Sequence, residues 1–380
     1  MSKLRLMFLF GTRPEAIKLA PLLIQTKKRH HDFDSVVVVT GQHRQMLDDV
    51  LGAFGIKPDV DLNLMTPQQT LFSLTSRIFS SLEPVMDQFQ PDIVVVQGDT
   101  TSTFAGALAG YYSRKKIAYV EAGLRTGNKW APFPEEIYRK AASTMADYLF
   151  APTLKAKENL LKEGYPDSSI SITGNTVIDA LSFMKERIKG LPCPVPDLAS
   201  RMERGEKMIL ITGHRRENFG QPFQRICRTF KKLALSYPQA CFVYPVHLNP
   251  HVQSTVRENL AGLPNFFLLP PLPYPDFVWL MYHCYLIITD SGGIQEEAPA
   301  LAKPVLVTRQ VTERPEALQA GVVKLVGDRE EEIIRWSSLL LEDKEAYRSM
   351  AKGVSPYGDG KACERILNIL TGSSFEEFKG

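Results

Sequence analysis

Several features that mark common classes of protein are missing from this chain. Only five cysteines occur among its 380 residues, and no two have the CxxC spacing of a zinc knuckle or a thioredoxin-like redox site. Such sparse cysteines are typical of a reducing compartment. No apolar run reaches the roughly 18 residues that a membrane span needs, and the apolar run near the N-terminus is too short for a signal peptide. The sequence therefore predicts a cytoplasmic protein without a membrane segment.

A strong excess of one charge is also missing. The 45 Lys and Arg residues against 42 Asp and Glu residues leave a net charge of +3, so nothing drives the whole chain toward nucleic acid or an anionic membrane. The GxGxxG fingerprint of nicotinamide and flavin enzymes is absent, and so is the GxSxG elbow of acyl-enzyme hydrolases. We therefore expect no cofactor, no metal and no nucleic-acid partner, whereas a small anionic ligand stays open.

The chain does contain an alternation of short apolar runs with longer stretches of helical period. The runs VVVV at 36–39 and IVVV at 93–96 are apolar on both faces, as in parallel strands that helices cover on both sides. This order predicts two doubly wound α/β domains with parallel sheets. We expect strands at Leu4–Phe10, Ser35–Thr40, Asp92–Gln97, Ile117–Val120, Tyr148–Ala151, Met208–Thr212, Cys241–Val246, Phe266–Leu269, Leu286–Thr289 and Pro304–Val307.

The two halves are separated by a stretch rich in proline and charge, Gly190–Gly205, which follows a helix-like segment, Val177–Lys189. We expect one domain over residues 1–175 and a second over residues 176–359. The last segment, from residue 360 onward, has an amphipathic helical pattern. The pattern alone does not say which domain this helix packs on.

Polar residues follow the ends of several predicted strands, where open parallel sheets bind their ligands. Arg13 and Lys18 follow the first strand and lie near the start of a helix, which favours anions. Asp99 follows a later strand, at a place where an aspartate also commonly caps the next helix. The alternative to a ligand site is a set of solvated charges and a cap at these helix starts.

Two more carboxylates lie nearby in the same half. Glu121 directly follows a strand, where a carboxylate needs a partner or a role. Glu135 precedes Arg139 by four residues, so an ion pair on one helical face is the alternative to a catalytic role. Clustered carboxylates raise the pKa of one member, which places an acid beside an ionised base. Together with Asp99, these residues predict acid–base chemistry.

The second half supplies groups that bind anions. His214 follows its first strand and precedes two arginines, a pattern that fits a diphosphate or an oxyanion. The sequence Ser-Gly-Gly at 291–293 leads a strand into a helix N-terminus, where backbone N–H groups hold phosphate oxygens. Glu297, one turn later, fits the hydroxyls of a ribose, and Arg314 lies at another loop–helix junction. A solvated basic turn and a plain glycine-rich turn are the alternatives.

Eight longer motifs run along the chain: GTRPEAIKLAPL at 11–22, GQHRQML at 41–47, GDTTSTFAGALA at 98–109, VEAGLRTGNKWAPFPEE at 120–136, GHRREN at 213–218, PVHLNP at 245–250, TDSGGIQEEAP at 289–299 and TERPEA at 312–317. By these motifs the chain resembles the non-hydrolysing UDP-N-acetylglucosamine 2-epimerases of bacteria from Phe10 to about Gly360. The resemblance implies a GT-B arrangement, in which two Rossmann-like domains face a central cleft and the C-terminal helix, within residues 360–380, packs back on the first domain.

The resemblance also implies a reaction. Members of this family interconvert UDP-GlcNAc and UDP-ManNAc without a metal or nicotinamide, and the product supplies cell-surface polysaccharide. The mechanism proposed for them eliminates UDP across the first two sugar carbons, leaves 2-acetamidoglucal, and re-adds UDP after the second carbon is protonated from the opposite face. By this resemblance the chain is an isomerase whose partners are UDP-GlcNAc, UDP-ManNAc and UDP. A homodimer and a second UDP-GlcNAc that acts as an activator are further expectations.

The motif match gives each of these positions a role. His214 and Arg13 are expected to stabilise the diphosphate, and Phe277 is expected to border the uracil. The implied catalytic residues are Asp99, Glu121, Glu135 and His214; the implied substrate-binding residues are Arg13, Lys18, Arg139, Phe277, Ser291, Gly292, Gly293, Glu297 and Arg314; the implied activator-binding residues are Gln42, Gln45, Arg215 and His247.

Three positions depart from the family pattern. Gln68 stands where relatives tend to have arginine, which weakens the activator site. Leu272 replaces a glutamine near the uracil; the lost hydrogen bond costs about 0.5–1.5 kcal/mol or is replaced by backbone contacts. Tyr138 stands where asparagine is usual beside the sugar. These changes leave a modified UDP-HexNAc open as the substrate, for instance a 3-acetamido uronic acid derivative. The functions of a GT-B glycosyltransferase and of a non-catalytic nucleotide-sugar sensor also stay open.

Overall fold

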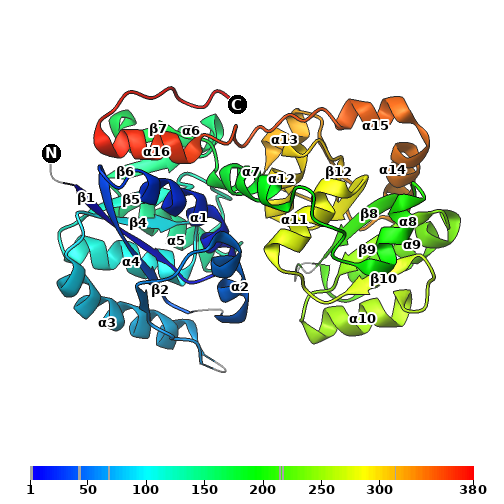
Figure 1. Ribbon diagram of the computed structural model, residues 1–380, viewed down its shortest axis with the longest axis horizontal. Coiled ribbons are helices and arrows are strands. Elements are labelled where there is room, and N and C mark those ends of the chain that lie inside the picture. The colour runs from blue at the N-terminus through cyan, green and yellow to red at the C-terminus, as the bar shows by residue number, and fades with distance from the viewer. Residues whose placement is uncertain (1–2, 42–43, 67–68, 214, 216–217, 313) are drawn as a thin grey trace. The chain divides into compact units, whose positions relative to one another are not determined.

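Two α/β units make up the computed structural model, which describes residues 3–41, 44–66, 69–213, 215, 218–312 and 314–380. Unit 1 comprises Met1–Phe183 and Tyr357–Gly380, and unit 2 comprises Met184–Pro356. The division falls inside helix α7 (Thr176–Ile188), later in the chain than the expected 175/176 boundary. The C-terminal helix α16 (Ala362–Thr371), drawn in red in Figure 1, belongs to unit 1 and packs on α1 (Arg13–Lys28).

Unit 1 is built around a seven-stranded parallel sheet with the strand order β3-β2-β1-β4-β5-β6-β7. The strands are β1 Leu4–Phe10, β2 Phe33–Val39, β3 Val60–Asp61, β4 Ile93–Gln97, β5 Lys116–Val120, β6 Tyr148–Ala151 and β7 Ile170–Ile172. Besides α1, α7 and α16, the helices are α2 Arg44–Phe54, α3 Leu71–Phe89, α4 Thr101–Tyr112, α5 Glu135–Met145 and α6 Leu154–Lys162, with a short 3₁₀ turn at Asp167–Ser169.

Unit 2 repeats the architecture with a six-stranded parallel sheet, in the order β10-β9-β8-β11-β12-β13. Its strands are β8 Lys207–Thr212, β9 Ala240–Pro245, β10 Phe266–Leu269, β11 Leu286–Thr289, β12 Val305–Val307 and β13 Val323–Leu325. Its helices are α8 Pro196–Glu203, α9 Gln221–Ser236, α10 Pro250–Leu260, α11 Tyr274–His283, α12 Gly292–Ala300, α13 Pro315–Gln319, α14 Glu330–Glu342 and α15 Lys344–Met350.

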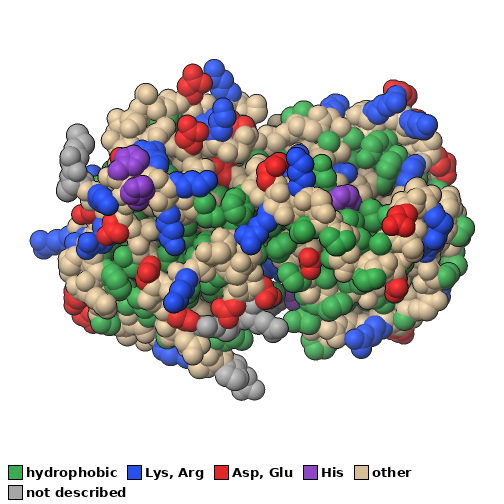
Figure 2. Space-filling view, in the orientation of Figure 1, with side chains coloured by type: hydrophobic (Ala, Val, Ile, Leu, Met, Phe, Trp, Pro, Cys, Tyr) green, Lys and Arg blue, Asp and Glu red, His purple; other side chains and the backbone are tan. Residues whose placement is uncertain are grey.

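Both sheets are covered by helices on both faces, which explains their unbroken apolar strands. In β1 the five consecutive residues from Leu6 to Phe10 are at most 1% exposed. In unit 1, α1 packs with α2 and α16, while α3 packs with α4 and α4 with α5. The prediction of two doubly wound parallel-sheet domains is therefore confirmed. On the face shown in Figure 2, acidic and basic side chains are mixed, as the small net charge suggests.

Ten strands lie where the sequence predicts them, within one or two residues at most ends, and three were not predicted. The unpredicted strands are β3, β7 and β13, which have only two or three residues each. All three lie at an edge of their sheet. Such short runs carry no periodic signal, and their hydrogen-bonded neighbours come from elsewhere in the chain. Among the described residues, no helix is long and apolar enough to cross a membrane.

Each sheet has one point where the chain reverses the direction in which it adds strands. In unit 1 this switch point lies between β1 and β4, and in unit 2 it lies between β8 and β11. The helices that follow the two central strands diverge to opposite faces there and leave a crevice at the carboxyl ends, where doubly wound folds bind their ligands. Among the described residues, the predicted site residues that follow the strands at these two points are Arg13, Asp99, Arg215, Ser291, Gly292 and Gly293.

Candidate active site

The carboxylate of Glu121 collects hydrogen-bond donors from three other elements of unit 1. Lys18 Nζ, from α1, lies 2.5 Å from Oε1 and 2.7 Å from Oε2. Gln97 Nε2, at the end of β4, donates to Oε2, and Asn175 Nδ2 donates to Oε1 at 3.2 Å. Glu121 is only 7% exposed and has a positive φ of 69°. An ammonium group and two amide donors together hold this buried carboxylate in a fixed orientation.

A second predicted carboxylate, Asp99, pairs with Arg139 of α5. Arg139 Nε and Nη2 both reach Asp99 Oδ2, at 2.9 and 2.6 Å. Burial is the largest single influence on Arg139 and works against its charge, but the charge and hydrogen bond of Asp99, together with Tyr119 and Glu136, outweigh burial and raise the pKa of the guanidinium. Because both donors meet the same oxygen, the other oxygen of Asp99 is not engaged by Arg139.

Glu135 does not form the ion pair that its spacing to Arg139 suggests. Arg139 instead reaches Glu136 Oε2 through Nη1, at 3.3 Å. Oε2 of Glu135 is buried and has no hydrogen-bond partner among the described residues. A buried carboxylate oxygen without a donor is costly, which is the condition expected of a group that meets a ligand or carries a proton during a reaction.

Sequence reasoning missed several residues that build this edge of unit 1. Gln97 and Asn175 orient Glu121, as described above. Glu136 is fully buried and accepts backbone N–H groups of Thr126 and Gly127 at 3.1–3.2 Å, which fixes the loop before α5. The adjacent Glu-Glu pair in the sequence offers two candidates, and only their contacts separate them: Glu136 holds the loop before α5, whereas Oε2 of Glu135 has no partner among the described residues.

The carboxyl edge of unit 2 has the form of an anion site at the start of α12. Ser291 is the N-cap of this helix, and Gly292 and Gly293 form its first turn. A Cβ atom added at Gly292 would lie 2.7 Å from Cζ of Arg314, so the guanidinium packs directly on this backbone. Arg314 Nε also donates to Glu296 Oε1 at 2.7 Å. The helix N-terminus and the guanidinium therefore place positive charge at one point.

Three further predicted residues of unit 2 lie on α12, on α11 and in the turn after β8. Glu297 is 7% exposed and accepts a hydrogen bond from the Tyr274 hydroxyl at 2.8 Å, a partner that the sequence did not suggest. The half-buried Phe277 lies on the same helix as Tyr274, α11. The backbone N–H of Arg215 donates to Asp290 Oδ2 at 2.9 Å, which ties the turn after β8 to the end of β11.

Four predicted or singled-out positions cannot be placed. His214, Gln42 and Gln68 lie outside the described residues, and so does the side chain of Gln45. Because two of its residues are not described, the activator site stays a prediction. The homodimer and the cytoplasmic location also stay predictions.

His247, the last predicted activator residue, follows β9 in unit 2. Burial lowers its pKa against the opposing charge of Asp290, and its Nδ1 accepts the backbone N–H of Asn249 at 3.1 Å. His247 and His251 have the spacing of a metal-binding pair, which the sequence reasoning overlooked. The described residues contain no group of three ligands that could hold a metal ion.

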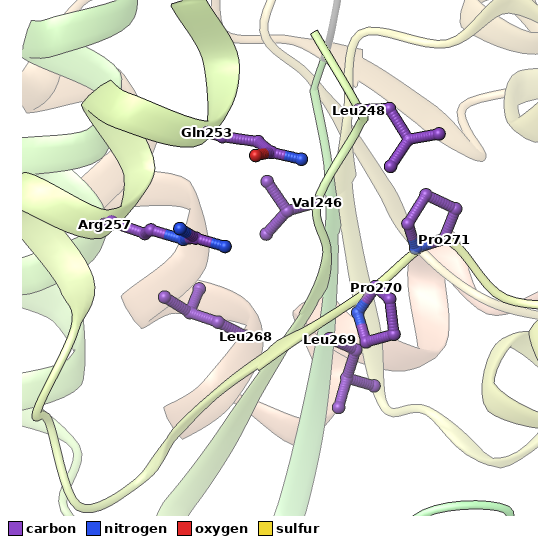
Figure 3. Close-up of a pocket in the computed structure, with 8 residues that line it drawn as sticks. All are labelled: Val246, Leu248, Gln253, Arg257, Leu268, Leu269, Pro270 and Pro271. Carbon is purple, nitrogen blue, oxygen red and sulfur yellow. The ribbon is translucent and has the colours of Figure 1, made fainter. Parts of the chain in front are cut away.

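A separate pocket of about 230 Å³ opens at the carboxyl ends of β9 and β10 in unit 2 (Figure 3). None of the predicted site residues lines it. Gln253 and Arg257 reach it from α10, and its other walls are apolar: Val246, Leu248, Leu268, Leu269, Pro270 and Pro271.

Comparison with known proteins gives one consistent result. A family model described as UDP-N-acetylglucosamine 2-epimerase matches residues 25–371. A UDP-N-acetylglucosamine 2-epimerase of Campylobacter jejuni is 51% identical over 372 residues, which cover 96% of this chain and 97% of that protein.

Solved structures agree. A UDP-GlcNAc 2-epimerase from Neisseria meningitidis, crystallised bound to UDP-GlcNAc, matches with a TM-score of 0.89 and 45% identity, over 98% of this chain and all of that one. A Methanocaldococcus jannaschii UDP-GlcNAc 2-epimerase, in complex with UDP-GlcNAc and UDP, matches with a TM-score of 0.81 and 32% identity over the same shares of the two chains.

Proposed function

This chain belongs to the UDP-N-acetylglucosamine 2-epimerase family, and from that membership we propose that it is an isomerase that interconverts UDP-GlcNAc and UDP-ManNAc. The observation that carries the proposal is the set of three carboxylates at the carboxyl edge of the unit 1 sheet, each in a different electrostatic environment. Inversion of a carbon that bears hydrogen requires one group that removes the proton and another that returns one from the opposite face.

The three carboxylates support such a division of roles. Glu121 is fixed by Lys18 and two amides, Asp99 is held by Arg139 through one oxygen, and Glu135 has a buried oxygen without a partner among the described residues. These different contacts support a division of roles in which one carboxylate removes a proton from the sugar and another returns one. We leave open which of them acts on which face of the sugar.

The anion site of unit 2 supports binding of the UDP portion. The first N–H groups of α12 and the guanidinium of Arg314 suit the diphosphate, and Glu297, oriented by Tyr274, suits the ribose hydroxyls. Departure of UDP develops negative charge on its terminal phosphate, so cationic groups at this place accelerate the elimination. In the proposed reaction UDP leaves across the first two sugar carbons, 2-acetamidoglucal forms, and UDP re-adds after the second carbon is protonated. We propose His214 and Arg13 as further cations for this step.

The decisive experiment is incubation of the protein with UDP-GlcNAc in deuterated water, followed by NMR. We expect deuterium to enter at the second sugar carbon and UDP-ManNAc to appear, without added metal or nicotinamide. A glycosyltransferase or a nucleotide-sugar sensor would leave that carbon–hydrogen bond intact. Absence of exchange with all substrates offered would overturn the proposal.

Variants of the carboxylates test their assignment. We expect Asp99→Asn and Glu121→Gln to lower turnover by at least about a hundredfold while UDP still binds, because proton transfer is lost and the unit 2 site is untouched. Asp34→Asn is the matched control, since Asp34 is half exposed and pairs only with Arg5 at the far end of β1. Near-normal turnover in either carboxylate variant would contradict the role given to that residue.

One observation favours a second candidate substrate. The ring of Tyr138 stacks on Phe104 of α4, with centroids 5.2 Å apart, where the family usually has an asparagine. An aromatic ring at this place changes the contacts available to a sugar substituent. The same exchange experiment with a UDP-linked 3-acetamido uronic acid derivative decides between the two: faster exchange with that sugar than with UDP-GlcNAc would identify the modified sugar as the substrate.

A further inference from the structure

Glu15 is a buried carboxylate that the proposed reaction does not use. It is the third residue of α1 and is only 1% exposed. A glutamate at this position of a helix commonly accepts the N–H of the N-cap residue, and the Thr12 N–H does lie 2.8 Å from Oε2. Such a capping interaction needs one oxygen and is usually made at the protein surface. The burial of Glu15 therefore calls for a further explanation.

The two oxygens of Glu15 contact two different turns. Oε2 accepts the N–H groups of Gly11 and Thr12, at 3.0 and 2.8 Å, from the turn that follows β1. Oε1 accepts the hydroxyl of Thr100 at 2.6 Å, from the turn that follows β4. The hydroxyl of Thr103 lies 3.1 Å from Oε1 and 2.6 Å from the carbonyl oxygen of Gln97, so it belongs to the same network.

These two turns form the walls of the switch-point crevice of unit 1. Strands β1 and β4 are hydrogen-bonded neighbours, but α1 and α4 leave them toward opposite faces of the sheet. Backbone hydrogen bonds of the sheet end at the strands, so they do not fix the two turns to each other. Among the described residues, Glu15 is the side chain whose carboxylate accepts donors from both turns.

The turns that Glu15 joins carry residues of the proposed active site. The first leads directly into α1, which begins at Arg13 and carries Lys18, the partner of Glu121. The second contains Asp99, directly before Thr100. A displacement of one turn against the other by a fraction of an ångström would misplace Asp99 relative to these cations, and proton transfer is sensitive to such shifts.

We propose that Glu15 is a positioning residue: by accepting donors from both turns, its carboxylate sets the place of Asp99 relative to Arg13 and Lys18. This inference rests on the proposed function for its catalytic consequence, and on the geometry alone for the connection between the turns. Burial raises the pKa of Glu15, while the hydrogen bonds from Thr100, Gly11 and Thr12 lower it again. These donors are therefore the groups that make its buried position tolerable.

The test uses Glu15→Gln in the full chain. The amide of Gln has one acceptor oxygen. When that oxygen keeps the Gly11 and Thr12 N–H groups, the NH2 group faces the Thr100 hydroxyl, which loses the charged acceptor to which it donates and must rotate to accept instead, so the connection between the turns is weakened. The matched control is Asp179→Asn. Asp179 is also a buried carboxylate of unit 1 that accepts two backbone N–H groups, but it contacts α16 and neither turn.

The first readout is amide hydrogen exchange followed by mass spectrometry, which does not depend on activity. We expect Glu15→Gln to speed exchange by at least about tenfold in peptides that cover residues 8–16 or 96–104, whereas Asp179→Asn speeds it only around α16. Unchanged exchange in both peptides would overturn the inference. The amide-exchange test of Glu15 remains valid even if the wild-type protein does not introduce deuterium at the second sugar carbon. That separate result would overturn the proposed function alone.

The second readout is kinetic. We expect Glu15→Gln to lower kcat by at least about tenfold with UDP affinity within about threefold, and Asp179→Asn to leave kcat within about threefold. A role in folding alone would lower the melting temperature and leave the kcat of the folded protein unchanged, which would also overturn the inference. If Glu15→Gln does not fold, a comparison of the Thr100→Val variant with the Thr100→Ser variant takes its place. Only the valine variant removes the hydroxyl donor, and only that variant should speed exchange in residues 8–16, on the opposite turn.

Discussion

Docking of the C-terminal helix on unit 1 should depend on pH through a single carboxylate, Asp179 of α7. Its oxygens accept the backbone N–H groups of Ala362 and Cys363, at 3.2 and 2.9 Å, in the first turn of α16. Burial raises the pKa of Asp179 from 3.8 to about 6, although the hydrogen bonds from Cys363 and Ala362 act in the opposite direction. The charge of Asp359 raises the pKa further, and Arg365, which pairs with Asp359, faces the same group.

The size and sign of the effect follow from this shift. Below pH 3.8, Asp179 is protonated in both the folded and the unfolded chain. Between pH 3.8 and about 6 the unfolded chain has released this proton while the folded chain keeps it, so the free energy of unfolding falls as the pH rises. A shift of about two pKa units corresponds to about 3 kcal/mol. Above about pH 6 both states are ionised, and this contribution no longer changes.

The assay compares the wild-type chain with Asp179→Asn by urea unfolding at several pH values between about 4 and 7. The variant cannot titrate at this position, so we expect the difference in unfolding free energy, wild type minus variant, to fall by about 3 kcal/mol over that range. Asp34→Asn, at a half-exposed position far from α16 in the sequence, is the control for a general effect of removing one carboxylate. A difference for Asp179→Asn that stays flat or rises with pH would refute the reasoning.

Three further substitutions have definite expected outcomes. Gly292→Ala places a Cβ atom 2.7 Å from Cζ of Arg314, so the guanidinium must leave the start of α12. We expect calorimetry to show about tenfold weaker binding of UDP, and an unchanged affinity would contradict the anion site. Gly123→Ala introduces a side chain at φ +88° against a backbone carbonyl oxygen of α6; we expect a loss of about 3 kcal/mol or more in urea unfolding, and a loss below about 1 kcal/mol would contradict the packing. Lys18→Met leaves Glu121 buried without its ammonium partner; we expect a loss of about 3 kcal/mol, and full stability would show that the two amides suffice.

How far the sequence predicts the fold depends on the length and burial of each strand. Long strands such as β1 and β4 are buried on both faces, so their apolar runs are visible in the sequence alone. Strands β3, β7 and β13 lie at sheet edges and have two or three residues. What makes them strands is pairing with a neighbour that is distant in sequence, and a single sequence does not record that pairing.

The residues of the candidate site also divide into those that the sequence alone indicates and those that only the folded structure identifies. The position directly after a buried strand is enough to single out Asp99 and Glu121. Their partners cannot be predicted from the local sequence, because Arg139 lies 40 residues from Asp99 and Asn175 lies 54 residues from Glu121. Local spacing is even misleading in one case: Glu135 stands four residues before Arg139, yet the guanidinium turns to Asp99 and Glu136. Only the sheet order, which brings distant strand ends together, decides between such pairings.

The three carboxylates have different partners, and this difference affects the stability of the carboxyl edge of the unit 1 sheet. Glu121 and Asp99 each face a buried cation, so their charges are largely compensated before any ligand binds. Glu135 is different, because its buried oxygen gains no donor from the described residues and its burial is a cost to the folded chain. A hydrogen-bond donor from a ligand would remove this cost. The edge is therefore organised so that ligand binding relieves an unfavourable burial at Glu135, whereas at Glu121 and Asp99 it meets charges that are already fixed in place.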